Sequence, residues 1–187
     1  MDELERIAAD AAGGDPLAAA ALVRATQSDV WRLCAALGDP QSADDLTQET
    51  FLRAFGALHR FEGRSSLRTW LFGIARHVCA DALRARRRRR VTLVRDADDL
   101  EPVGGTRLTD SVAEGAAVTD LLARLAPDRR EAFVLTQLIG LSYAEAAEVV
   151  GCPVGTIRSR VARARADLVT SLGGVQAGED ASDSAHG

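Results

Sequence analysis

The sequence predicts an all-α protein made of two small helical domains joined by a flexible acidic linker. Apolar residues recur at helical spacing through most of the 187-residue chain. The chain has only 5 prolines and 4% aromatic residues, while Ala, Leu and Arg, which favour helices, are abundant. No alternating strand pattern precedes residue 90. The helical pattern lapses at residues 91–117, which are rich in Asp, Gly, Pro and Thr and therefore predict the linker.

The first domain is expected over residues 15–90, after an N-terminal extension of residues 1–14 that holds a short amphipathic piece. Asp15-Pro16 supplies an N-cap and a first-turn proline, so a helix should begin there and run to about Leu37. The predicted buried side of this helix consists of Leu17, Ala21, Val30, Trp31 and Leu37.

Two more helices complete the predicted first domain. One should start at Ser42 as its capping residue and run to about Leu58. Its predicted buried side holds Ala43, Thr50, Phe51, Ala54, Phe55 and Leu58. The other should begin at Ser65 or Ser66 and reach about Arg88. Its predicted core stripe is Leu67, Leu71, Ile74 and Val78.

The second domain is expected over residues 118–172, and residues 173–187 are expected to form a disordered tail. Two helices, over 118–125 and 128–139, should pack beneath a helix-turn-helix. In that motif Ser142 and Glu145 have the spacing of a capping box. Gly151 closes the first helix, and Pro153 prevents its continuation.

The second helix of this motif is predicted to bind DNA. Its core-facing side should hold Val154, Ile157, Val161, Ala164 and Leu168. Small residues and Arg occupy the other side, which suits close approach to a groove and bidentate contacts with guanine. A solvated Arg-rich face on an ordinary bundle helix is the alternative interpretation. The turn signals and the Arg cluster together favour DNA binding.

Charge is distributed unevenly along the chain. The net charge is −4, yet residues 51–95 carry 12 Arg against 2 acidic residues, and acidic segments lie on either side. This pattern indicates DNA on one surface and a basic protein partner on another. All 23 basic residues are Arg, for which a GC-rich coding bias is as good an explanation as function. The five-Arg run at 86–90 is weak evidence, since such runs are often only solvated.

Two other segments are candidates for binding. The loop 59–66, with Phe61 and Arg residues, leads into the Arg-lined third helix, which fits single-stranded DNA binding. The sequence does not decide whether Trp70 and Phe72 stack on bases or lie in the core. On the second helix, one stripe places an apolar residue among acidic and amide side chains: Asp45, Gln48, Glu49 and Leu52. This stripe is either a docking patch or a solvated acidic face with a stray Leu.

Enzymatic and metal chemistry find no support in the sequence. Cys34, Cys79 and Cys152 are widely spaced, as are the 3 His residues, so no metal site and no cofactor are expected. Cys34 and Cys79 are most simply small core residues, with a redox sensor as the alternative. No apolar run is long enough for a membrane span and no signal peptide is recognisable, which predicts a cytoplasmic protein.

The order of these segments resembles that of the extracytoplasmic-function sigma factors, the small two-domain members of the bacterial sigma-70 family. Residues 42–55 resemble region 2.2 of that family, residues 61–77 resemble regions 2.3 and 2.4, and residues 141–168 resemble region 4.2. The segment 152–160 is the most diagnostic part. The resemblance covers about residues 15–172 and is closest to actinobacterial C-type members.

The resemblance implies a protein that joins core RNA polymerase and directs it to promoters, without catalysis of its own. The second domain would read the −35 element as duplex through Thr156, Arg158, Ser159, Arg160 and Arg163. The first domain would recognise and open the −10 element and capture a flipped base in the loop 59–66. Its −10 DNA-binding residues would be His59, Arg60, Phe61, Arg64, Ser65, Arg68, Thr69 and Arg76. The stripe of Asp45, Gln48, Glu49 and Leu52 would dock on the clamp helices of the largest polymerase subunit. The acidic linker would thread the active-site and RNA-exit region. The sequence leaves open whether an anti-sigma factor binds this protein.

Two other classes share a helix-turn-helix. A stand-alone transcriptional regulator usually needs a dimerisation or ligand domain, and the sequence supplies no obvious one. A serine recombinase needs a catalytic domain of alternating strands and helices, which the first 90 residues do not predict.

Overall fold

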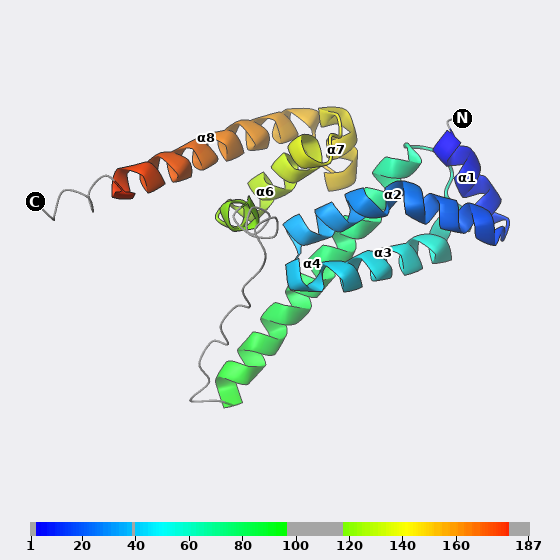
Figure 1. The fold of residues 1–187 in the computed structure, drawn as a ribbon, viewed down its shortest axis with the longest axis horizontal. Coiled ribbons are helices and arrows are strands. Elements are labelled where there is room, and N and C mark those ends of the chain that lie inside the picture. The colour runs from blue at the N-terminus through cyan, green and yellow to red at the C-terminus, as the bar shows by residue number, and fades with distance from the viewer. Residues whose placement is uncertain (1–2, 39, 97–117, 180–187) are drawn as a thin grey trace, which may run out of the picture.

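The computed structural model describes residues 3–38, 40–96 and 118–179, and this part of the chain is all-α, as the sequence predicts. The first unit contains α1 (Glu3–Ala12), α2 (Pro16–Leu37), α3 (Ala43–Ala57) and α4 (Leu67–Asp96). Short 3₁₀ turns, η1 (Pro40–Ser42) and η2 (Leu58–Arg60), flank α3. Helices α2, α3 and α4 pack on one another, and α1 folds back on α2 (Figure 1).

Local signals set the helix boundaries of the first unit. The Asp15 carboxylate accepts a hydrogen bond of 2.8 Å from the backbone N–H of Leu17, and Pro16 opens α2, so the predicted start is confirmed. Ser42 stands at the N-cap of α3 but makes no capping hydrogen bond through its side chain, so its predicted capping role is wrong. The Ser66 hydroxyl does accept a hydrogen bond from the N–H of Thr69 at the start of α4.

The buried side of α2 differs from the prediction. Val30 and Leu37 are buried as expected, but Leu17 is 77% exposed and Trp31 is 45% exposed. The buried residues of this helix are Ala18, Leu22, Thr26, Val30, Leu33, Cys34, Ala36 and Leu37. This stripe includes small residues and a threonine, whose hydroxyl donates to the carbonyl of Leu22 at 2.8 Å. The large side chains of Leu17 and Trp31 lie one position away from this stripe, which is why the sequence pattern placed them on the buried side.

The second unit consists of a short helix over 118–123, α6 (Pro127–Phe133), a π-helical turn η3 (Val134–Leu138), α7 (Tyr143–Val150) and α8 (Val154–Glu179). Helices α6 and α7 both pack on α8. Ile157, Val161 and Ala164 of α8 are buried as predicted, whereas Val154 is 39% exposed. The π turn ends the predicted helix of residues 128–139 with one wider turn.

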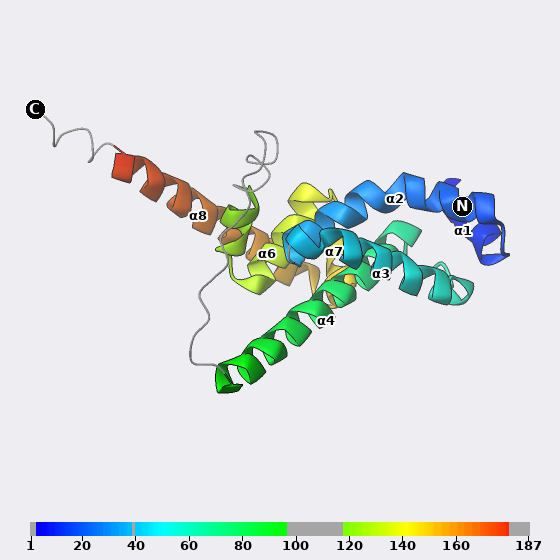
Figure 2. The ribbon, with the colours of Figure 1, turned by 60° about the horizontal axis from the view of Figure 1, so that its bottom comes forward.

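The two units pack against each other. Their buried apolar residues form one continuous cluster, in which Phe72 and Ala75 of α4 join Leu135 and Ala146 of the second unit. Helix α7 lies against α4, and η3 lies against α2. In Figures 1 and 2 the C-terminal halves of α4 and α8 extend away from this shared body in different directions.

Helices α4 and α8 both continue past the residues at which flexible segments are predicted to begin. Helix α4 continues to Asp96, so the first residues of the predicted linker 91–117 are helical. Helix α8 continues to Glu179, past the Gly pair at which the predicted tail 173–187 begins. The remaining parts of those two predictions, residues 97–117 and 180–187, lie outside the described residues.

Candidate nucleic-acid interface

The helix-turn-helix has the local geometry that its sequence predicts. The Ser142 N–H donates to the Glu145 carboxylate at 2.8 Å, and the Glu145 N–H donates to the Ser142 hydroxyl at 3.2 Å. These two bonds form a capping box. Hydrogen bonds to the Glu145 carboxylate from the side chain and the backbone N–H of Ser142 lower the pKa of that carboxyl. Gly151 has a φ of 75°, a left-handed conformation that ends α7 and turns the chain into α8.

The predicted −35 residues lie together along the N-terminal half of α8. Arg158, Ser159 and Arg163 are exposed, whereas Thr156 and Arg160 are half-buried. The Arg160 guanidinium lies 3.3 Å from the carboxylate of Asp128, a residue in the first turn of α6. This ion pair holds the Arg160 side chain against α6. Arg158 and Arg163 have no ion-pair partner among the described residues. The face therefore offers two guanidinium groups to a ligand and holds a third in place.

The predicted −10 residues divide into an exposed group and a covered group. His59, Arg60 and Arg64 are exposed, and Ser65 is half-buried. The Phe61 ring is half-buried and pairs with Trp70, with ring centroids 5.3 Å apart. The Trp70 ring therefore packs against the Phe61 ring. Phe72 is fully buried, so its position, which the sequence leaves undecided, is in the core.

The covered group lies where the two units meet. The Arg68 guanidinium donates to the Asp29 carboxylate at 2.7 Å and to the Ile139 carbonyl at 3.0 Å, and it lies over the Phe72 ring. The Arg76 Nε donates to the Glu131 carboxylate at 2.6 Å.

Thr69 is only 3% exposed, and its hydroxyl pairs with that of Ser66 at 2.8 Å. Thr69 is therefore closed to DNA in this arrangement, and Arg68 and Arg76 are engaged with the protein. No local sequence signal identifies Asp29 and Glu131 as their partners.

The predicted docking stripe lies on α3, and its apolar member is open. Leu52 is 70% exposed, Asp45 and Gln48 are exposed, and Glu49 is half-buried. The Glu49 carboxylate accepts a 2.7 Å hydrogen bond from Arg53, so part of its charge is compensated.

A groove of about 620 Å³ between α2 and α3 continues this surface. It is lined by Gln27, Ser28, Trp31, Arg32, Asp44, Thr47 and Gln48. The Trp31 indole N–H donates to Asp44 at 2.8 Å, which holds the ring at the wall of the groove. Sequence reasoning placed Trp31 in the core and so missed it as a surface residue. An aromatic residue one position off the buried stripe is the signal that could have found it.

Comparison with known proteins identifies both units. The family described as Sigma-70 region 2 matches residues 22–89, and the family described as Sigma-70, region 4 matches residues 115–168. Together these matches cover more than half of the chain. The chain belongs to the sigma-70 family. This protein is an extracytoplasmic-function sigma factor, because its curated relatives carry that name.

The curated relatives are sigma factors, and the matches cover most of both chains. The sigma factor is 56% identical over 164 residues to the protein named ECF RNA polymerase sigma factor SigC of Mycobacterium tuberculosis, covering 87% of this chain and 88% of that one. It is 41% identical over 140 residues to ECF RNA polymerase sigma factor EcfG of Rhodopseudomonas palustris, covering 72% and 74%. The resemblance to C-type members is thereby confirmed.

Solved structures agree with the fold of the sigma factor. The structure of CnrH in complex with the cytosolic domain of CnrY matches with a TM-score of 0.74 and 29% identity, covering 92% of this chain and 99% of that one. The sigma factor RpoE of Bartonella quintana, solved with the anti-sigma factor NepR, matches with a TM-score of 0.59 and 32% identity, covering 80% and 91%. Within the described residues of this sigma factor, no helix is long and apolar enough to cross a membrane.

Proposed function

We propose that this sigma factor binds core RNA polymerase and directs it to promoters. The observation that carries the proposal is the presence in one chain of both matched regions, 22–89 and 115–168, with an Arg-bearing recognition face on α8. The polymerase supplies the chemistry, and the sigma factor supplies recognition. Because its partner is the bacterial transcription machinery, its place of action is the cytoplasm.

Recognition of the −35 element is assigned to α8. Its exposed face carries small side chains with Arg158 and Arg163 free of protein partners among the described residues, which suits insertion into a major groove. Arg163 lies nearest the middle of this face and is assigned to a base edge. Arg158 and Arg160 flank it and are assigned to phosphates. Thr156 and Ser159 are polar positions on the same face.

Opening of the −10 element is assigned to the loop 59–66 and the first half of α4. Asp29 and Glu131 compete with phosphate for Arg68 and Arg76 while the two units are packed together. Use of the whole −10 surface therefore requires the two units to separate. In the separated state, Arg68 and Arg76 track the single strand and Phe61 stacks on a base.

Polymerase docking is assigned to the stripe of α3 and the adjoining groove. Leu52 and Trp31 supply exposed apolar surface, and Asp44, Asp45 and Glu49 complement a basic partner. The proposed partner of this docking surface is the pair of clamp helices in the largest subunit of RNA polymerase. Structural relatives were solved with anti-sigma proteins, which supports a search for such a partner here too.

Run-off transcription tests the proposal. Purified core polymerase with this sigma factor should give discrete transcripts from a subset of genomic fragments, and core polymerase alone should not. Absence of both core-polymerase binding and sigma-dependent transcripts, with DNA binding intact, would argue for a stand-alone regulator instead.

A further inference from the structure

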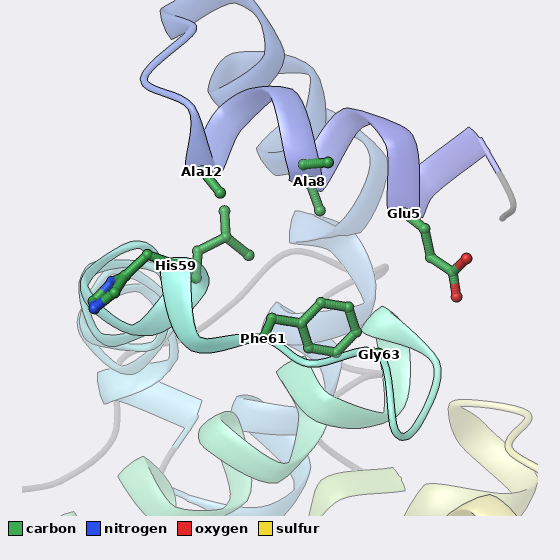
Figure 3. Close-up of a pocket in the computed structure, with 8 residues that line it drawn as sticks. Glu5, Ala8, Ala12, His59, Phe61 and Gly63 are labelled. Atoms are coloured by element: carbon green, nitrogen blue, oxygen red, sulfur yellow. The ribbon is translucent and has the colours of Figure 1, made fainter.

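The two surfaces assigned to DNA differ in what they present to it. On the first unit, the Phe61 ring lines a cavity of about 420 Å³ between the −10 loop and α1 (Figure 3). On the second unit, the recognition face of α8 has no side chain at the second residue of the helix, Gly155. Gly155 is exposed, so this position is open to a partner.

The backbone of α8 does not require a glycine at position 155. Gly151, four residues earlier, has a φ of 75° and ends α7 in a conformation that favours glycine, whereas Gly155 has no positive φ and lies in the α-helix. Glycine forms helices more poorly than any residue except proline. An alanine at position 155 should therefore favour α8.

Packing within the sigma factor does not require this glycine either. A Cβ atom added at Gly155 would meet nothing within 4 Å. At Gly38, by contrast, an added Cβ would lie 2.7 Å from the Cys34 carbonyl oxygen, so close packing accounts for that glycine. Position 155 has room for a side chain in the free protein, which indicates that the space is needed by something outside the chain.

The neighbours of Gly155 on the helix surface belong to the face assigned to the −35 element. Residues three and four positions apart are adjacent on a helix. At those distances from Gly155 lie Arg158 and Ser159, which are both exposed. Ile157 is fully buried and turns the opposite side of α8 toward the core. The N-terminal residues of a recognition helix are the ones that contact base edges, and Gly155 lies in this first turn.

The base edge that best suits a missing side chain is that of thymine. Its 5-methyl group projects into the major groove and is read by apolar contact, whereas the other base edges there present hydrogen-bonding groups. The Gly155 Cα offers an apolar contact and leaves the space of about one methyl group. Val154, which is 39% exposed, adds apolar surface at the preceding position.

We propose that Gly155 admits the 5-methyl group of one thymine of the −35 element against the backbone of α8, and thereby contributes sequence specificity without a side chain. The proposal rests on the promoter-recognition function above and adds a specificity residue to its −35 face. The methyl group takes the space that a Cβ atom would occupy, so a side chain at position 155 and the thymine methyl group exclude each other.

The test compares thymine with uracil, which differs from it only by the absence of that methyl group. Core polymerase with the full chain binds duplex fragments of a promoter found by run-off transcription, in which deoxyuridine replaces each thymidine of the −35 element in turn. With wild type, one replacement should weaken binding about fourfold, the effect of one buried methyl group. Gly155→Ala should reverse the preference at that position. It should bind the thymine fragment about tenfold more weakly than wild type, because of overpacking, and the uracil fragment as well as wild type does.

Two controls separate DNA recognition from stability. Gly155→Ala should melt at or above the wild-type temperature, because alanine favours the helix. Gly56→Ala makes the same change at an exposed helical glycine of α3, where an added Cβ also meets nothing within 4 Å. This control should leave the ratio of thymine to uracil binding unchanged at every position.

The outcomes distinguish this inference from the proposed function. An unchanged thymine-to-uracil ratio at every position in Gly155→Ala would overturn the inference and leave the sigma-factor function intact. Equal losses on the thymine and uracil fragments would also overturn it, since they would indicate a general change in how α8 is placed on DNA. A lower melting temperature of Gly155→Ala would show that the glycine serves the fold, which again would overturn it. Failure of wild type to bind any promoter with core polymerase would remove the proposed function itself.

Discussion

Arg76 of α4 and Glu131 of α6 join the two units of the sigma factor, with 2.6 Å between the Arg76 Nε and a Glu131 carboxylate oxygen. The two side chains are 25% and 18% exposed, so the pair is partly desolvated. Arg76 is one of the residues assigned to the −10 strand. Under the proposed function, the same guanidinium would have two competing anionic partners, the Glu131 carboxylate when the units are packed together and phosphate when they separate.

Glu131→Gln should increase binding of single-stranded DNA by the free sigma factor. The substitution removes one competitor for Arg76, and a partly exposed ion pair is worth up to about 1 kcal/mol, or roughly a fivefold change in affinity. Fluorescence anisotropy with a labelled oligonucleotide measures it. Asp167→Asn is the matched control, because it breaks a 2.7 Å pair with Arg129 inside the second unit. An equal increase in both variants would contradict the competition.

Arg163→Ala should weaken −35 recognition at particular base pairs. Arg163 is exposed and has no ion-pair partner among the described residues, so its loss should disturb no internal ion pair and report on the proposed DNA contact alone. The cost should be about 1–3 kcal/mol at the contacted pair. Arg158→Ala should cost affinity more evenly across sequences, because it is assigned to phosphate. A matrix of single-base promoter variants distinguishes the two patterns, and uniform losses for Arg163→Ala would refute its assignment.

The local parts of the fold could be predicted because their signals lie within a few residues. The Ser142–Glu145 capping box and the Gly151 turn were readable in this way, and both are confirmed. The buried side of α2 was predicted less well. Bulky Leu17 and Trp31 suggested a stripe one position away from the side that the helix buries. That side combines small and large residues: Ala18, Leu22, Thr26, Val30, Leu33, Cys34, Ala36 and Leu37.

The relation between the units could not be predicted from the sequence. Arg76 pairs with a residue 55 positions away, and Arg68 with a carbonyl 71 positions away. Such pairs leave no periodicity or spacing signal, and family resemblance points to DNA for the same side chains. The exposed positions of His59, Arg60 and Arg64 fit the polar composition of their loop, and their −10 role stays a prediction. Only the folded structure shows that distant residues engage Arg68 and Arg76 and that Thr69 is buried.

Gln48→Ala combined with Leu52→Ala should lower the affinity for core polymerase without unfolding the first unit. Both residues are exposed on α3, so their loss should change stability by less than about 0.5 kcal/mol. Core-binding affinity and a thermal melt are measured on the same sample. Leu17→Ala, at another highly exposed leucine, is the control and should bind normally. Unchanged core binding, or a large fall in melting temperature, would defeat the docking assignment.

Loss of the capping box should destabilise the helix-turn-helix in a pH-dependent way. Glu145 has its pKa lowered by hydrogen bonds with Ser142, so it stabilises the fold above its unfolded value of about 4.3. That contribution is lost as pH falls through the lowered pKa. Glu145→Gln should therefore be less stable than wild type at pH 7, and the two should converge in acid. Denaturant melts across pH test this, and a constant difference down to pH 2 would contradict it.

The three cysteines should react with alkylating agents in a fixed order. Cys34 and Cys79 are buried, which confirms their predicted place in the core, whereas Cys152 is half-buried in the helix-turn-helix turn. The pKa of the Cys79 thiol is raised by its hydrogen bond with Cys34 and by burial, so little reactive thiolate forms there. Iodoacetamide at pH 8 should modify Cys152 first, and the other two only at the rate of unfolding. Mass spectrometry of peptides over time gives the order. Rapid labelling of Cys79 in the folded protein would show that the α2–α4 core opens without global unfolding.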